Sequence, residues 1–160
     1  MQRFEQIYAE HVAAVRAYVT RRAPDAVVDD IVADTFVVCL RKIDRVPENP
    51  LPWLYAVARK TLANERRKRA KLAHGQSLPA SGPSPVGDGI LAEAFNSLTE
   101  NDREVLRLVA WEGLSLTDAA TVFGCSAVTC RVRYHRAKSR LASKLAAAGS
   151  IRPVPKGVTR

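Results

Sequence analysis

The residues of this chain best suited to chemistry are cations, and they gather in two stretches. The C-terminal stretch contains no acidic residue from Thr129 to Lys144, and its positively charged or titratable members are Arg131, Arg133, His135, Arg136, Lys138, Arg140 and Lys144. Guanidinium groups can donate paired hydrogen bonds to guanine edges, while their neighbours neutralise phosphate. The stretch therefore predicts a nucleic-acid surface, with Arg131 as a candidate for base contact.

The residues just before this stretch predict a helix-turn-helix. Leu116 to Phe123 is suited to a short helix, in which Ala120 is small enough to let a second helix approach. Gly124 can supply a left-handed turn, and Ser126 can start the second helix. The second helix of such a motif fits the major groove of DNA. The alternative, a solvated basic face on a bundle helix, leaves the turn unexplained.

The second basic stretch follows two aromatic residues, Trp53 and Tyr55. Its members are Arg59, Lys60, Arg66, Arg67, Lys68, Arg69 and Lys71. Cations beside aromatic stacking platforms are what single-stranded DNA requires, and stacking contributes ~1–3 kcal/mol per base. That is comparable with the ~1.4 kcal/mol per step lost when a duplex opens, so such a surface can trap melted DNA. Both aromatic residues have a second interpretation, as members of a hydrophobic core.

Four aspartates, Asp25, Asp29, Asp30 and Asp34, fall in the first half of an expected helix. Carboxylates near a helix N-terminus are favourable in themselves. Asp30 and Asp34, however, share one side at a spacing of four, where like charges repel. A basic protein surface is one source of compensation, so both helix stabilisation and partner docking stay open.

The composition bounds the class of protein. The chain has 160 residues, 47% of them hydrophobic, and a net charge of +9, which points to a polyanionic partner. We expect a cytoplasmic protein, because no apolar run approaches the ~18 residues of a membrane span and the N-terminus does not resemble a signal peptide. The three cysteines lack the companions of a zinc site and are expected to be buried or half-buried, so we expect no metal and no cofactor. The three histidines lie in distant segments, which disfavours a small metal-dependent nuclease.

Hydrophobic periodicity predicts helices throughout and no strand, and hence an all-α chain of two small helical domains joined by a flexible linker. Residues 1–73 hold three helices, separated by Pro24-Asp25 and by the loop Arg45 to Pro52, with Pro52 opening the third. Residues 74–89 are rich in Gly, Pro and Ser and are expected to be a linker. Residues 90–148 hold the remaining helices, with Thr99, Ser115 and Ser126 as expected caps, and residues 149–160 are expected to be a disordered basic tail.

Taken together, these segments resemble a sigma factor of RNA polymerase of the ECF (extracytoplasmic function) family. Residues 29–36, DDIVADTF, resemble the region 2 signature EDLVQETF of that family, and residues 53–60, WLYAVARK, resemble its WLYxIARN. Residues 98–106, LTENDREVL, resemble the opening of region 4, with the helix-turn-helix in register behind them. The resemblance covers about residues 4–146. Ala33, Lys60 and Asn64 depart from the family pattern, and so does the short proline-rich loop before Trp53.

The resemblance implies an alternative sigma factor, without a catalytic site of its own, that binds core RNA polymerase and promoter DNA and helps to melt the promoter. Region 2 would dock on the polymerase β′ clamp through Asp29, Asp30, Asp34 and Phe36. It would hold the melted minus-ten element through Trp53, Tyr55, Arg59, Lys60, Arg66, Arg67 and Arg69. Region 4 would bind the polymerase β flap and read the minus-thirty-five element through Thr129, Arg131, Val132, Arg133, His135, Arg136, Lys138 and Arg140. An anti-sigma factor is a further candidate partner.

A two-domain transcription regulator with a C-terminal helix-turn-helix is the alternative interpretation. It would share residues 90–148 but would carry a sensor or receiver domain in front. A receiver domain would show strand patterns. The acidic helix, the Trp53 motif and the basic third helix show none. Binding to core RNA polymerase separates the two interpretations.

Overall fold

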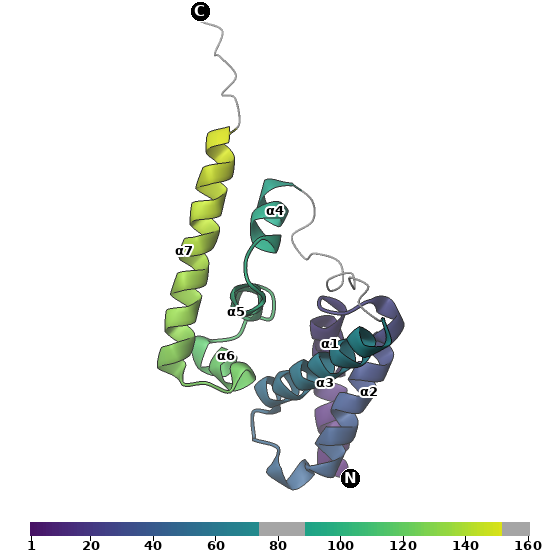
Figure 1. The fold of residues 1–160 in the computed structure, drawn as a ribbon. Helices are drawn as coiled ribbons and strands as arrows, with labels where there is room; N and C mark the ends of the chain where they lie inside the picture. The colour runs from purple at the N-terminus through teal and green to yellow at the C-terminus, as the bar shows by residue number, and fades with distance from the viewer. Residues whose placement is uncertain (74–88, 152–160) are drawn as a thin grey trace, which may run out of the picture.

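The computed structural model describes residues 1–73 and 89–151, and every regular element in these ranges is helical. Figure 1 shows two groups of helices. The first group comprises α1 (Gln2–Thr20), α2 (Asp25–Arg41), the short 3-10 helix η1 (Ile43–Arg45) and α3 (Pro50–Leu72). The second comprises α4 (Ile90–Asn96), α5 (Glu100–Ala110), α6 (Leu116–Phe123) and α7 (Ala127–Ile151). The all-α prediction is confirmed. The linker predicted at 74–89 lies outside the described residues except for Gly89, as does the predicted tail beyond Ile151.

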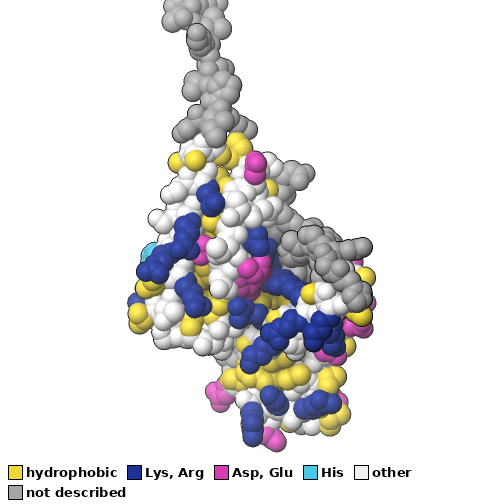
Figure 2. All heavy atoms as spheres, viewed as in Figure 1, with side chains coloured by type: hydrophobic (Ala, Val, Ile, Leu, Met, Phe, Trp, Pro, Cys, Tyr) yellow, Lys and Arg dark blue, Asp and Glu magenta, His cyan; other side chains and the backbone are white. Residues whose placement is uncertain are grey.

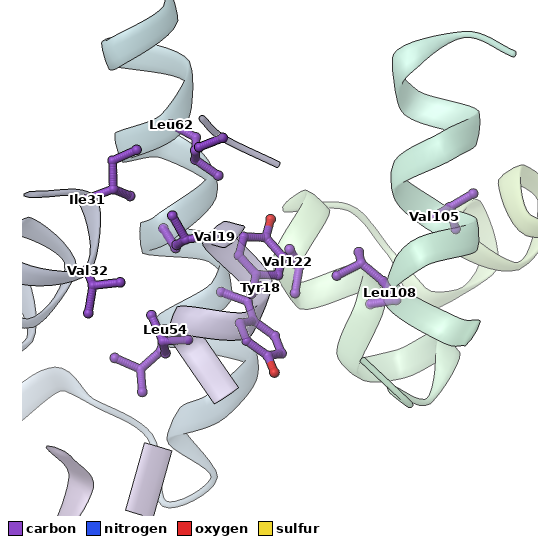
Figure 3. Close-up of a cluster of buried hydrophobic side chains, with 14 of the residues drawn as sticks. Tyr18, Val19, Ile31, Val32, Leu54, Leu62, Val105, Leu108 and Val122 are labelled. Carbon is purple, nitrogen blue, oxygen red and sulfur yellow. The ribbon is translucent and has the colours of Figure 1, made fainter. Parts of the chain in front are cut away.

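The first group is a three-helix bundle in which each helix turns one apolar face inward. Val15, Tyr18 and Val19 of α1 are fully buried, as are Leu54 and Ala58 of α3. Side chains at spacings of three and four share one face of a helix, so α1 presents a continuous apolar stripe to α2 and α3. Figure 3 shows Val19 with Ile31, Val32, Leu54 and Leu62 from the neighbouring helices.

Three helix boundaries differ from the sequence-based prediction. The second helix, expected to carry Ile43, ends at Arg41, and Ile43–Arg45 form the separate 3-10 helix η1. The third helix begins at Pro50, two residues earlier than Pro52, because the first helical turn needs no backbone N–H donors and accepts both prolines. The last helix continues through Gly149 to Ile151, so the tail expected from residue 149 is helical over its first three residues. Pro24 precedes α2 in an extended conformation, as the predicted break requires.

The second group is organised by three capped helix starts, all of which the sequence predicted. The hydroxyl of Thr99 accepts a hydrogen bond from the backbone N–H of Asp102 at 3.3 Å, and that of Ser115 accepts one from Asp118 at 3.1 Å. Each hydroxyl satisfies a backbone donor that the helix leaves unpaired, which stabilises the start by about 1 kcal/mol. α7 packs against α4, α5 and α6 as the long outer helix of Figure 1.

The two groups of helices are in contact, an arrangement that the sequence did not indicate. α6 packs against α3, and one continuous set of buried side chains runs through both groups. Figure 3 shows Tyr18 of α1 and Val122 of α6 where the groups meet. The Arg59 guanidinium of α3 lies 4.7 Å from the centre of the Phe123 ring of α6. The contact brings residues predicted to bind DNA next to the second group.

Candidate nucleic-acid interface

The turn between α6 and α7 has the geometry of a helix-turn-helix. α6 ends at Phe123, and the φ of 71° of the next residue, Gly124, places it in the left-handed region that favours glycine. Two residues later the Ser126 hydroxyl accepts a hydrogen bond from the backbone N–H of Thr129 at 3.1 Å and starts α7. Cys130 and Ala137 are fully buried and fix the inner side of α7. The opposite side of α7 is thereby turned to solvent.

The solvent side of α7 carries the predicted reading residues. Exposed among them are Thr129, Arg131, Val132, His135, Arg136, Lys138 and Arg140, and only Arg133 is half-buried. Figure 2 shows Lys and Arg side chains on the α7 side of the molecule and more of them over the first group of helices. α7 itself carries no acidic residue, and Asp102 of α5 neutralises Arg140, so the face keeps a net positive charge. A helix with this exposure and charge is suited to the major groove.

The cations of this face divide into free and engaged groups. Arg140 donates to both carboxylate oxygens of Asp102, at 3.0 and 2.8 Å, and so ties α7 to α5. Arg133 lies 5.5 Å from the Phe123 ring, and the Lys138 amine lies 5.3 Å from the ring of Tyr134. Arg131 and Arg136 form no ion pair with any residue that the structure describes. The two free guanidinium groups are therefore the ones available to bases.

The aromatic residues at the start of α3 belong mainly to the core. Tyr55 is 3% exposed and stacks on Tyr18 with ring centres 4.7 Å apart. Burial, with the nearby charge of Glu112, raises the pKa of Tyr55 to about 12. Trp53 is half-buried against the same core. The core interpretation therefore holds for Tyr55, which has no free face for a base, whereas Trp53 keeps part of its surface in solvent.

The cations of α3 border a cleft of about 540 Å³ between the two groups of helices. Its basic wall is formed by Arg22, Arg59, Lys60, Arg66 and Arg67. Lys60, Arg66 and Arg67 are exposed, and Arg59 is half-buried beneath Phe123. Arg69 is engaged by Glu65 one turn earlier, with an N–O distance of 3.3 Å. A cationic wall along an open cleft is suited to a phosphate backbone.

The segment before α3, from Ile43 to Pro47, is held by Arg3 of α1. One Arg3 amine donates to the backbone oxygen of Ile43 at 2.6 Å, and the other donates to those of Val46 and Pro47. Sequence reasoning placed a loop from Arg45 to Pro52 but missed Arg3, for which the sequence offers no local signal. The guanidinium satisfies carbonyl groups that the irregular backbone leaves unpaired. The loop is thereby fixed against α1.

The acidic side of α2 is exposed, as the spacing predicted. Asp30 and Asp34 face solvent, while Asp29 pairs with Arg16 of α1 at 2.6 Å. Next to them Val37 and Leu40 are 45% and 43% exposed. Sequence reasoning missed these apolar neighbours. Their spacing of three residues, which places them on one side of α2, was the signal that could have identified them. The surface combines two unpaired carboxylates with exposed apolar groups, a composition typical of a protein-docking face.

Phe36, predicted to contact the polymerase together with these aspartates, is only 4% exposed. Its ring centre lies 4.9 Å from that of Tyr8, and Phe4 completes the cluster at 6.5 Å from Phe36. Phe36 thus belongs to the core behind the acidic face and supports that face from inside.

A buried polar cluster joins the two groups of helices, and sequence reasoning missed it. Arg22, 2% exposed, donates to Glu104 at 2.9 Å and to Glu112 at 3.0 and 3.1 Å, and the Tyr18 hydroxyl donates to Glu104 at 2.9 Å. Burial, then the charge of Glu104, raises the pKa of Tyr18 well above its ordinary value. Burial alone would lower the pKa of Arg22, but Glu104, Tyr18 and Glu112 raise it. Arg22 therefore stays a cation and Tyr18 stays a proton donor near neutral pH.

Three further features bear on the kind of site. Within residues 1–73 and 89–151, no three His, Cys, Asp or Glu side chains are grouped so that they could hold a metal ion. Over the same residues, no helix combines the length and the hydropathy of a membrane span. Cys39 and Cys130 are buried and Cys125 is half-buried, as expected for structural cysteines.

The sequence matches two family models that coincide with the two groups of helices. Residues 7–72 match sigma-70 region 2, and residues 88–141 match sigma-70 region 4. The fold and the two cationic surfaces therefore define a sigma factor of RNA polymerase. Such a protein is an initiation subunit rather than the polymerising enzyme.

Individual relatives specify the family. The ECF RNA polymerase sigma factor EcfG of Rhodopseudomonas palustris is 33% identical over 128 residues, covering 73% of this chain and 70% of that protein. The RNA polymerase sigma factor CnrH of Cupriavidus metallidurans is 31% identical over 164 residues, covering 89% and 86%. A solved structure of the sigma factor RpoE with the anti-sigma factor NepR, from Bartonella quintana, is similar with a TM-score of 0.70 and 26% identity, over 91% of this chain and 98% of that one.

This chain belongs to the ECF family of sigma factors, as its resemblance predicted. It is an alternative sigma factor, which binds core RNA polymerase and directs transcription initiation at specific promoters.

Proposed function

We propose that residues 1–73 and 90–148 act as two promoter-binding units, with 74–89 as the connector between them and 149–160 as an accessory tail. The first unit docks on the polymerase clamp and holds the melted minus-ten element. The second binds the polymerase flap and reads the minus-thirty-five element as duplex. The chain needs no catalytic site of its own for promoter melting, because the free energy of binding DNA offsets the stacking energy that is lost when the duplex opens.

The outer face of α7 reads the minus-thirty-five element, and its exposure behind a capped turn is the observation that carries the proposal. Arg131 and Arg136 are free to hydrogen-bond base edges, while His135, Val132 and Thr129 contribute from the same face. Arg133, Lys138 and Arg140 are already engaged within the protein, so they contribute charge toward phosphate more than base recognition. A base-reading guanidinium contributes ~1–3 kcal/mol to binding.

The cationic wall of α3 holds the melted minus-ten strand. Lys60, Arg66 and Arg67 are exposed along one side of the cleft and can follow a phosphate backbone. Arg59 and Arg69 lie on the same helix and add charge. The partly exposed edge of Trp53 can contact an unstacked base, whereas buried Tyr55 acts by supporting the helix from the core.

The acidic face of α2 docks on the polymerase clamp. Asp30 and Asp34 supply charge, and the exposed Val37 and Leu40 supply the apolar area that a stable contact needs. Like charges four residues apart repel in the free helix, and a basic partner relieves this repulsion. Asp29 contributes through its pair with Arg16, which lies beside the face.

The docking face is tested by charge reversal. Asp30→Arg combined with Asp34→Arg should abolish assembly with core RNA polymerase, measured by native gel shift of purified proteins, while circular dichroism stays unchanged. Glu5→Arg combined with Glu10→Arg is the matched control, because these exposed residues of α1 change the net charge equally. Normal assembly of the Asp30/Asp34 variant, or equal loss in the control, would refute the docking role.

An anti-sigma factor is a proposed regulator of this chain. Support comes from the structures of RpoE with NepR and of CnrH with the cytosolic domain of CnrY, the latter similar with a TM-score of 0.62, 28% identity and coverage of 90% of this chain and 88% of that chain. We place the protein in the cytoplasm, where core polymerase and the promoter are found. Co-purification of a small partner with the tagged full chain from its native host tests this proposal.

A further inference from the structure

Two valines on the outer face of α7 are exposed and lie outside the hydrophobic core of the residues that the structure describes. Val128 is 67% exposed and Val132 is 42% exposed, and a spacing of four places them on one side of the helix. A β-branched residue is a weak helix former, and both side chains keep a large part of their surface in water. Folding therefore does not explain the pair. Arg131, His135 and Arg136 surround it, so the apolar stripe lies within a cationic face.

The position of the stripe indicates what covers it. The first turns of a recognition helix approach base edges in the major groove. The apolar group that the major groove offers is the C5 methyl of thymine. Resting on the proposed role of α7, we propose that Val128 and Val132 contact thymine methyl groups. The preferred upstream element then carries thymine beside the base bound by Arg131.

The test removes one methyl group at a time. Holoenzyme assembled from the full chain and core polymerase first selects its upstream element from a randomised promoter library. Each thymine of that element is then replaced by deoxyuracil, which lacks only the methyl. Burial of one methyl group corresponds to about fourfold in affinity. Promoter binding should fall by about this factor at one or two positions, and the sensitivity should vanish in Val128→Ala or Val132→Ala but persist in the control Leu91→Ala.

The outcomes separate this proposal from the one on which it rests. If deoxyuracil has no effect, or the same effect in the valine variants as in the natural chain, the methyl contact is refuted. Loss of holoenzyme assembly in the valine variants would assign the stripe to the polymerase and also refute it. If no upstream element is selected, or Arg131→Ala binds normally, the role of α7 itself fails.

Discussion

Arg136 and Arg140 lie one turn apart on α7, and we expect opposite consequences from their loss. Arg140 donates both of its short contacts to Asp102, whose side chain is 8% exposed, whereas Arg136 forms no ion pair in the described part of the chain. Arg140→Ala therefore leaves a nearly buried carboxylate without its cation. Arg136→Ala removes a solvent-facing group only.

The magnitudes follow from these surroundings. An unpaired buried polar group costs ~1–3 kcal/mol. Because the Arg140 side chain is 54% exposed and partly screened by solvent, the lower part of that range applies. A loss of ~1–2 kcal/mol corresponds to roughly 2–8 °C in unfolding midpoint for a chain of this size. Arg136→Ala should leave the midpoint unchanged but weaken promoter binding by ~1–3 kcal/mol, roughly 5- to 150-fold.

Both variants are measured by differential scanning calorimetry and by binding of their holoenzymes to a cognate promoter. Each serves as the control for the other, because the two changes are chemically identical. The reasoning is refuted if Arg136→Ala lowers the unfolding midpoint while Arg140→Ala lowers only DNA affinity, or if the two variants cannot be told apart.

Three further changes test how the elements are positioned. Gly124→Ala should lower the free energy of unfolding in urea by ~1–2 kcal/mol, because the φ of Gly124 is left-handed. Gly124→Asn should cost less. The added Cβ meets open space, so equal costs for the two variants would contradict a cost that is set by backbone conformation. Thr99→Ala should cost ~1 kcal/mol by the same measurement, and Thr99→Ser should retain most of that stability, since it keeps the capping oxygen. Burial raises the pKa of Glu100, but hydrogen bonding and charge from Arg103, then Arg66, lower it overall. The stabilisation from Glu100 is therefore present above the ordinary pKa of 4.5 and is lost as pH falls through the lower pKa of the folded state. Glu100→Gln should flatten the acid limb of a stability-against-pH curve, and an unchanged limb would contradict this.

Local signals in the sequence were enough to predict the helix-turn-helix. Ser115, Gly124 and Ser126 act within a few residues of their own positions, through backbone geometry and hydroxyl caps. Such interactions depend little on the rest of the fold. The exposed cationic face of α7 then follows from helical periodicity, since Cys130 and Ala137 define the buried side.

Features that depend on tertiary contact were less accessible. Tyr55 is buried by its stack on Tyr18 and Phe36 by its cluster with Tyr8, and no local pattern distinguishes Tyr55 and Phe36 from exposed platforms. The pairing of Arg22 with Glu104 and Glu112 joins residues far apart in the chain. In sequence these three are ordinary surface charges, and only the contact between the two groups of helices removes them from water.

The central claim is that α7 reads duplex DNA upstream while α3 holds the melted strand, both on one polymerase. It is tested most directly by transcription in a purified system, with core RNA polymerase, the full chain and a promoter library randomised in both blocks. The natural chain should enrich templates with two separate sequence blocks, and Arg131→Ala with Arg136→Ala should relax the upstream block while leaving the downstream block and core-polymerase binding intact. Enrichment of the same upstream block by the double variant, or no enrichment by the natural chain, would contradict the account.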